Sequence, residues 1–325
     1  MRDAIPGDGA GRAALLAAAF AAVVAAASWI DLSGTLLGRA LLPAIGSTFG
    51  TAADGTPHGA RLVVGLVAAV LLAANVLAIR LLPFRLQVAV VWLELLALAL
   101  AFFAGFDLSY AFIADRLPFL VFQGAAMTVY VSVVSIVLSC VVALVAALAR
   151  ISRSGPALAV ATFYISFFRG TPLLLQIYLI YLGLPQLGLV MEAVPAGILA
   201  LTLCYGAYMA EIFRAGIEGV PRGQREAAMA LGLRERLVMR KVILPQAFRI
   251  VVPPIGNQFI AMLKDSSLVS VMGVWELMFV ARTQGRSEFR HLEMLITAAL
   301  IYWALSMVFE LIQSRIEARF RVAQR

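Results

Sequence analysis

The chain has 325 residues, of which 62% are hydrophobic and 14% charged, and its mean hydropathy is +0.95. Soluble domains have about 45–50% apolar residues, so this composition excludes an ordinary soluble domain and indicates an integral membrane protein. The net charge of +8 is dispersed among apolar segments, so we attribute it to membrane topology and to contact with anionic lipid headgroups, and we expect no nucleic-acid partner.

Eight stretches approach the roughly 20 apolar residues that a membrane helix needs. We therefore predict an all-α integral membrane protein with about eight transmembrane helices, because β-barrel strands would be shorter and would alternate in polarity. The predicted spans are residues 13–30, 62–79, 86–106, 122–149, 157–184, 196–212, 254–281 and 292–312.

The first span has two interpretations. Arg2 and Arg12 precede an Ala-rich core that ends in Ala-Ala-Ala-Ser, which is also typical of a signal peptide and its cleavage site. We favour a retained helix and leave the cleaved form open.

Lys and Arg near the helix ends predict the orientation, since cytoplasmic loops carry an excess of them. With both termini in the cytoplasm, eighteen of these residues lie inside and six outside. The six are Arg39, Arg61, Arg116, Arg282, Arg286 and Arg290. We expect a multi-pass protein of the bacterial cytoplasmic (inner) membrane.

We divide the chain into residues 1–116, with three predicted spans, and residues 117–325, with five. Glu94 is the one intramembrane charge of the first part. The later spans are interrupted by polar residues, and charges inside a bilayer are costly enough to indicate function. Function is therefore expected in residues 117–325.

The sequence FRGTPLLLQ, at residues 168–176, places Arg169, Gly170 and Pro172 in the middle of the fifth span. Proline removes a backbone donor and clashes with the preceding turn, so we expect the helix to kink or break there. Backbone exposed at membrane depth requires protein or a water-filled cavity around it. We therefore predict that Arg169, Thr171 and Gln176 line a translocation path; the alternative is a packing kink with Arg169 reaching outward.

The seventh span and the end of the sixth add further polar candidates for this path. They are Glu211, Asn257, Gln258, Lys264, Asp265, Ser266 and Ser267. A structural network that holds the helices together is an equally weighted alternative for the seventh span. For Glu211 we favour a structural i,i+3 pair with Arg214.

A charged cytoplasmic loop is predicted at residues 218–252. Pro221 suits a helix start, a short helix follows over 222–231, and Gly232 is typical of a C-terminal cap. A second, amphipathic helix follows, and we expect Pro245 and the pair Pro253–Pro254 to restart the chain towards the membrane. The alternative is a helix that merely lies on the lipid surface.

This loop resembles the hallmark of the permease subunits of binding-protein-dependent ABC importers, namely EAA, three residues, Gly, nine residues, then an aliphatic residue, any residue, Leu and Pro. The matching residues are Glu226, Ala227, Ala228, Gly232, Val242, Leu244 and Pro245. FRGTPLLLQ, AYMAEIFRAGI and KDSSL are similar to sequences of the polar amino acid uptake group, of the histidine and glutamine permease type. The chain departs from the family at Leu233 and Arg234, where Ser or Thr often caps the second helix.

The resemblance implies a five-helix permease core with three additional N-terminal helices. It also implies a second permease chain, identical or different, two cytoplasmic ATPase subunits that dock on the EAA loop, and an external solute-binding protein that delivers a polar amino acid. We expect no catalytic residue, metal site or cofactor in this chain. Neither of its two lysines follows a glycine, so a GxxxxGK[ST] phosphate loop is impossible.

Two other functions are alternatives. An ion-driven secondary carrier would also use broken helices and charges at the midplane of the membrane. An intramembrane enzyme is the weakest alternative, because the spans contain no His and no convincing pair of nucleophile and base. Cys140 and Cys204 both lie in spans and are interpreted as buried apolar residues.

Overall fold

The computed structural model describes residues 58–320, so the first predicted span lies outside the described residues. The described part is helical throughout and contains no strand. The chain divides into two compact units, Met1–Asp107 and Leu108–Arg325. Residues 108–116, which we expected in the N-terminal part, thus begin the second unit.

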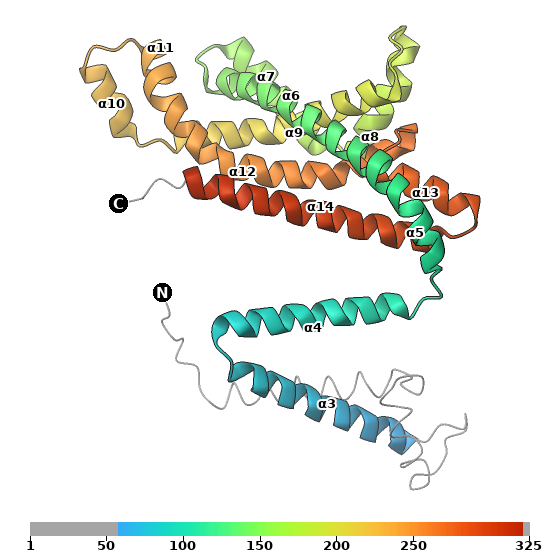
Figure 1. The fold of residues 1–325 in the computed structure, drawn as a ribbon. Helices are drawn as coiled ribbons and strands as arrows, with labels where there is room; N and C mark the ends of the chain where they lie inside the picture. Colours follow the sequence, from blue (N-terminus) through green and yellow to red (C-terminus); the bar gives the residue numbers. More distant parts are fainter. Residues whose placement is uncertain (1–57, 321–325) are drawn as a thin grey trace. The chain divides into compact units, whose positions relative to one another are not determined.

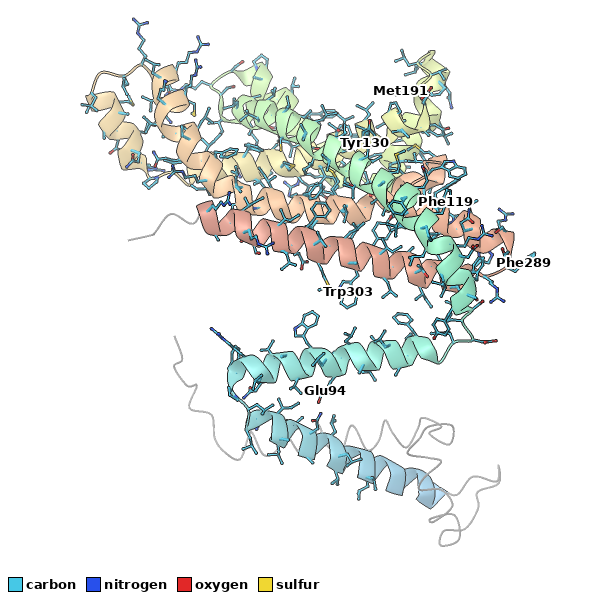
Figure 2. The ribbon with its side chains drawn as sticks, viewed as in Figure 1. Glu94, Phe119, Tyr130, Met191, Phe289 and Trp303 are labelled. Atoms are coloured by element: carbon cyan, nitrogen blue, oxygen red, sulfur yellow. The ribbon has the colours of Figure 1, made fainter. Side chains whose placement is uncertain are left out.

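In the first unit, α3 (His58–Arg80) and α4 (Phe84–Ala104) form a helical hairpin (Figure 1). They correspond to the second and third predicted spans. Asn75 Nδ2 donates a hydrogen bond of 2.9 Å to Glu94 Oε1 across the hairpin, and Figure 2 shows Glu94 on the side of α4 that faces α3. The one carboxylate predicted in these spans therefore has a polar partner on the neighbouring helix.

The second unit is a bundle of long helices joined by shorter ones. Its elements are α5 (Tyr110–Phe119), the π-helix η1 (Leu120–Ala125), α6 (Ala126–Ile151), α7 (Gly155–Gly170), α8 (Leu173–Tyr178), the π-helix η2 (Leu179–Gly183), the 3₁₀ helix η3 (Leu184–Leu187), α9 (Ala193–Glu218), α10 (Arg222–Ala230), α11 (Glu235–Leu237), the π-helix η4 (Val238–Ile243), α12 (Leu244–Asp265), the 3₁₀ helix η5 (Ser266–Met272), α13 (Leu277–Ser287) and α14 (His291–Phe320).

Four segments of the described residues are long and apolar enough to cross a membrane: Phe84–Phe103, Tyr110–Ile151, Ala193–Glu218 and His291–Arg319. The bent pair formed by α7 and the helices after it makes a fifth if its two arms are one span. The all-helical fold is confirmed, whereas a count of eight spans goes beyond these residues.

The core of the bundle lies where α6 packs along α9, with α12 against α9 and α14 against α12 (Figure 1). Small residues allow the close approach, as is usual between membrane helices. A Cβ on Gly206 of α9 would lie only 2.7 Å from Tyr164 Oη and 3.0 Å from Val142 Cγ1. Ser139 of α6 donates to the carbonyl of Thr202 at 3.2 Å. Small side chains and an interhelical hydrogen bond therefore hold α6 against α9 at this point.

The seventh predicted span, over 254–281, is not a single helix, so that prediction is wrong. α12 ends at Asp265, η5 follows, and Gly273 takes a left-handed conformation with φ +82°. A new helix, α13, then begins at Leu277. The apolar composition concealed this turn, because a buried turn needs apolar side chains as much as a span does.

Glu276 holds α13 in place. Its carboxylate is fully buried and accepts hydrogen bonds from the amides of Met278 at 2.9 Å and Phe279 at 2.7 Å, as an N-cap does. It also accepts a bond of 2.6 Å from Tyr302 Oη on α14. Thr128 Oγ1 of α6 accepts a bond of 3.1 Å from the amide of Leu277. One carboxylate thus joins the start of α13 to α14.

We predict that Glu276→Ala destabilises the fold. The substitution removes an N-cap, which contributes about 0.5–2 kcal/mol, and leaves the partly buried Tyr302 hydroxyl without its acceptor, which costs up to about 1–3 kcal/mol. The matched control is Glu192→Ala, since Glu192 is also an N-cap residue but makes no side-chain capping bond. Thermal unfolding in detergent should lower Tm by several degrees for Glu276→Ala alone. Equal Tm values for the two variants would contradict this role.

Candidate functional site

The loop between α9 and α12, which we call the coupling loop (residues 218–252), has a corner fixed by Gly232. Gly232 has φ +76°, and its amide donates to the Met229 carbonyl at 2.9 Å. The next amide, of Leu233, donates to the Ala228 carbonyl at 3.2 Å. Together these bonds form a Schellman cap. The predicted helix over 222–231 and its end at Gly232 are confirmed.

The coupling loop has a small apolar core of its own. Ala228, 5% exposed, is the contribution of α10. The other buried members, from the end of α9 to the start of α12, are Ile217, Val220, Val238, Ile243 and Ala247. Val242 and Leu244 pack partly buried against them. A small side chain at position 228 therefore sets the distance between α10 and η4.

Glu226 and Ala227 lie on the exposed side of α10. Met229 and Leu231, near them in the sequence, are 56% and 82% exposed. Among the described residues Glu226 makes no ion pair, whereas Arg225 pairs with Glu235 across the corner. The loop therefore presents a free carboxylate together with apolar side chains, a combination suited to contact with another protein. Of the two alanines of the EAA motif, Ala227 is exposed and Ala228 is buried.

The second helix of the loop continues into the bundle without a break. α11, η4 and α12 join through residues with right-handed helical φ and ψ, from Glu235 to Asp265. Pro245 and the pair Pro253–Pro254, which we expected to restart the chain towards the membrane, all lie within α12. Pro245 is the second residue of α12 and follows the π-helix η4 after one residue. A π-helical turn shifts the carbonyl acceptors by one residue, which relieves the clash between the ring and the preceding turn.

The predicted break in the fifth span is present. α7 ends at Gly170, α8 begins at Leu173, and the chain bends by 108° between the two arms of the span. Gln176 of α8 is buried, and its Nε2 lies within hydrogen-bonding distance of the carbonyls of Phe168 (2.9 Å) and Thr171 (3.0 Å) and of Thr171 Oγ1 (2.9 Å). Thr171 and Gln176 therefore form hydrogen bonds with backbone carbonyls at the helix break.

Arg169 lies beside α9. Its Cζ is 5.3 Å from the ring centroid of Tyr208, which is within the range of a cation–π interaction. The side chain is exposed and forms no ion pair within residues 58–320. An exposed guanidinium in a membrane-spanning segment is costly against hydrocarbon. This side of α7 therefore suits a polar cavity or another protein chain.

Asp265, at the end of α12, is linked to the same part of α9. Tyr205 Oη donates to Asp265 Oδ2 at 2.8 Å. The rings of Tyr205 and Tyr208 lie 6.4 Å apart. Lys264 and Asp265 are both exposed. The two tyrosines thus connect a guanidinium on α7 with a carboxylate on α12, two charges that are far apart in the sequence.

The other polar candidates of α12 and η5 lie in different surroundings. Asn257 Oδ1 accepts a bond of 2.9 Å from Gln313 Nε2 of α14. Ser266 is buried, and its hydroxyl donates to the carbonyl of Leu263 at 2.7 Å. Gln258 and Ser267 are half-buried. Asn257 and Ser266 therefore have structural partners.

Glu211 belongs to an ion-pair network near the coupling loop. One carboxylate oxygen accepts from Arg150 of α6, and the other from Arg214 Nη2 at 2.9 Å. Arg214 also donates to Glu218 at 2.6 Å. The i,i+3 pair that we favoured is confirmed, and Arg150 adds a tie from α9 to α6.

Tyr205 and Tyr208 are not among the site residues predicted from the sequence. A signal for them was available, because a tyrosine hydroxyl inside an apolar span needs a partner. The two residues are also three apart in the sequence, which places them on one face of a helix.

A family model described as "Binding-protein-dependent transport system inner membrane component" matches residues 141–322. The chain belongs to this family. The matched residues include the coupling loop, the break between α7 and α8, and the charged end of α12. As a family member the chain is an inner membrane transport component and not an enzyme, because ATP hydrolysis in these systems belongs to separate subunits.

Curated relatives of this family are permease proteins. The arginine transport system permease protein ArtQ of Bacillus subtilis (strain 168) is 38% identical over 216 residues, which cover 66% of this chain and 98% of that protein. The L-cystine transport system permease protein TcyB of the same organism is 39% identical over 197 residues, which cover 60% of this chain and 84% of that protein.

Two solved structures of transporters share the fold. A chain from an amino acid ABC transporter with histidines has a TM-score of 0.62 and 37% sequence identity, covering 66% of this chain and all of that one. A chain from the inward-facing MetNI methionine ABC transporter has a TM-score of 0.55 and 21% identity, covering 63% of this chain and 97% of that one. The second likeness concerns the fold alone.

We predict that Gln176→Glu disrupts the break in this family member. A carboxylate cannot donate to the carbonyls of Phe168 and Thr171, so buried acceptors would face a negative charge, at a cost of about 1–3 kcal/mol or more. Gln186→Glu is the control, since Gln186 is exposed on η3. Thermal unfolding should lower Tm for the first variant and leave it nearly unchanged for the second. A stable Gln176→Glu protein would contradict the structural role of this amide.

Proposed function

We propose that this chain is the permease subunit of an ATP-driven importer of polar amino acids, and that the coupling loop receives the ATPase subunit. The observation that carries the proposal is the EAA hairpin: its corner is fixed by Gly232, and Glu226 and Ala227 are exposed on it. The relatives named for arginine and L-cystine transport support the substrate class.

The continuous helix from Glu235 to Asp265 supplies a mechanism for coupling. ATP binding would draw two ATPase subunits together and displace the loops docked on them. Because α11, η4 and α12 are one helix, displacement at Glu235 would reach Lys264 and Asp265 at the other end. The transporter would then alternate between openings on the two faces of the membrane, a population shift driven by differential binding.

The substrate class fits the charges at the end of that helix. Every free amino acid carries an ammonium group and a carboxylate. Arg169 and Asp265 offer one charge of each sign, linked by Tyr205 and Tyr208. Lys264 adds a second cation beside Asp265. We propose that these groups border the translocation path, and that selection among amino acids occurs mainly on an external solute-binding protein.

The proposed assembly contains a second permease chain, two cytoplasmic ATPase subunits, the external binding protein and the surrounding lipid. We propose eight transmembrane helices, of which three precede the permease core of residues 117–325, with both termini in the cytoplasm. The excess of Lys and Arg on the side of the coupling loop supports this orientation. None of the matched proteins reported above favours an ion-driven carrier.

We predict that Gly232→Val uncouples the permease from its ATPase. A β-branched residue at positive φ costs on the order of 1–3 kcal/mol, so the corner would shift and ATPase binding should weaken about tenfold. No atom would crowd a Cβ at this position, so the effect comes from the backbone. Gly232→Asn is the matched control, because asparagine tolerates the left-handed conformation. The measurements are co-purification with the ATPase subunits and ATP hydrolysis stimulated by the loaded binding protein.

A Gly232→Val permease that retains both its ATPase subunits and its stimulated hydrolysis would show that the corner has no part in coupling. Equal losses for valine and asparagine would show that the left-handed backbone is not the cause.

We predict that uptake of a polar amino acid such as arginine into proteoliposomes requires ATP, the ATPase subunits and the binding protein together. Removing any one should reduce uptake to the level of empty liposomes. Uptake driven by a sodium or proton gradient without ATP would overturn the proposal and support a secondary carrier.

A further inference from the structure

A hollow with basic walls lies at the end of the second unit opposite the coupling loop. It has a volume of about 910 Å³ between α8, η5, α13 and α14. Figure 1 shows α10 and α11 at one end of this bundle and α13 at the other. Arg282, Arg286 and His291 line the hollow, and among the described residues no Asp or Glu does.

The two arginines of the hollow lack a counter-charge within the part of the chain that the structure describes. Arg282 and Arg286 are one turn apart on α13, where like charges destabilise a helix. Their basic neighbours are neutralised: Arg116 pairs with Asp115 and Glu288, and Arg290 pairs with Glu293. The acidic side chains in these pairs are thus already engaged, and the hollow is left electropositive.

The hollow is built on a rigid support. Glu276 fixes the start of α13 to α14. At the other end of α13, the amide of Arg290 donates to the carbonyl of Gly285 at 2.8 Å. A Cβ on Gly285 would lie 3.0 Å from His291 Cα, so the two helices approach closely there. The basic side chains are therefore attached to backbone that is fixed before any partner binds, which lowers the entropic cost of binding.

Phe289 adds an apolar feature on the turn between α13 and α14. It has φ +57°, the one positive value among the non-glycine residues that the structure describes. Its side chain is 91% exposed and projects away from the bundle (Figure 2). Strain of this kind costs on the order of 1–3 kcal/mol and gathers at functional positions. The turn thus holds an aromatic ring in solvent, between Arg286 and His291 in the sequence.

The combination of arginines and an exposed aromatic ring is typical of the energetically dominant residues of protein interfaces. The family requires a binding protein, and the proposed orientation places this end outside, where Lys and Arg are scarce. We propose that the hollow receives an acidic side chain of the solute-binding protein between Arg282, Arg286 and His291, while Phe289 packs against apolar surface beside it. This inference rests on the proposed function.

The test uses the complete complex of permease and ATPase subunits in nanodiscs. The probe is the solute-binding protein that stimulates ATP hydrolysis by the wild-type complex. For Arg282→Glu/Arg286→Glu we expect docking at least about tenfold weaker, because like charges across an interface repel, and a loss of the salt dependence of the association rate. Arg315→Glu is the control: it makes the same type of charge change at an exposed position towards the other end of α14 and should leave docking unchanged.

A second variant removes the ring without changing the backbone. In Phe289→Asn the new asparagine tolerates the left-handed conformation, so Tm should not fall. Docking should weaken about tenfold, as is common for an aromatic residue at the centre of an interface.

Unchanged docking in either variant would overturn the proposal. A second outcome would also overturn it: the charge reversal leaves docking unchanged and alters only how strongly the permease prefers phosphatidylglycerol to phosphatidylcholine in the nanodisc. The hollow would then be a site for lipid headgroups. A wild-type complex whose ATP hydrolysis responds to no binding protein would contradict the proposed function itself.

Discussion

Backbone amides and carbonyls that are buried away from water must find partners within the protein. The rest of this structure depends on that constraint, since two of its helical segments are interrupted. At the break between α7 and α8 the Gln176 amide reaches two carbonyls and a hydroxyl. After η5, Glu276 accepts from two amides and Thr128 from a third. At each interruption, buried polar side chains form hydrogen bonds with the backbone groups that the helices leave unpaired.

The polar side chains of the bundle fall into two groups, those with a structural role and those available for transport. Gln176 and Glu276 are buried and satisfy backbone or hydroxyl groups. Arg169, Lys264 and Asp265 remain exposed, and Arg169 and Asp265 contact the tyrosine pair of α9. A charge left exposed in a membrane segment is costly, so these three mark the side of the bundle where a cavity or another chain would offset that cost.

The segments on either side of the second interruption connect the two ends of the bundle. The coupling loop is continuous with α12, whose far end carries Lys264 and Asp265. η5 and α13 follow directly, and Glu276 ties them to α14. The residues from Glu235 to Asp265 are helical without interruption, so a displacement at the coupling loop can be transmitted to the far end of α12. The same rigidity holds the basic hollow of α13 in shape at the opposite end.

The sequence by itself determined the membrane class, the helix at 222–231 with its end at Gly232, and the break at Gly170–Pro172. Composition, glycine and proline act locally, so each of these features can be read from a few neighbouring residues. Only the tertiary structure decided that Pro245 lies within a helix, that a turn at Gly273 divides residues 254–281, and that Ala228 is buried while Ala227 is exposed. It also decided that Gln176 supports the break and that Arg150 joins Glu211. These outcomes depend on groups supplied by other helices or by the packing around them, and the local sequence does not contain that information.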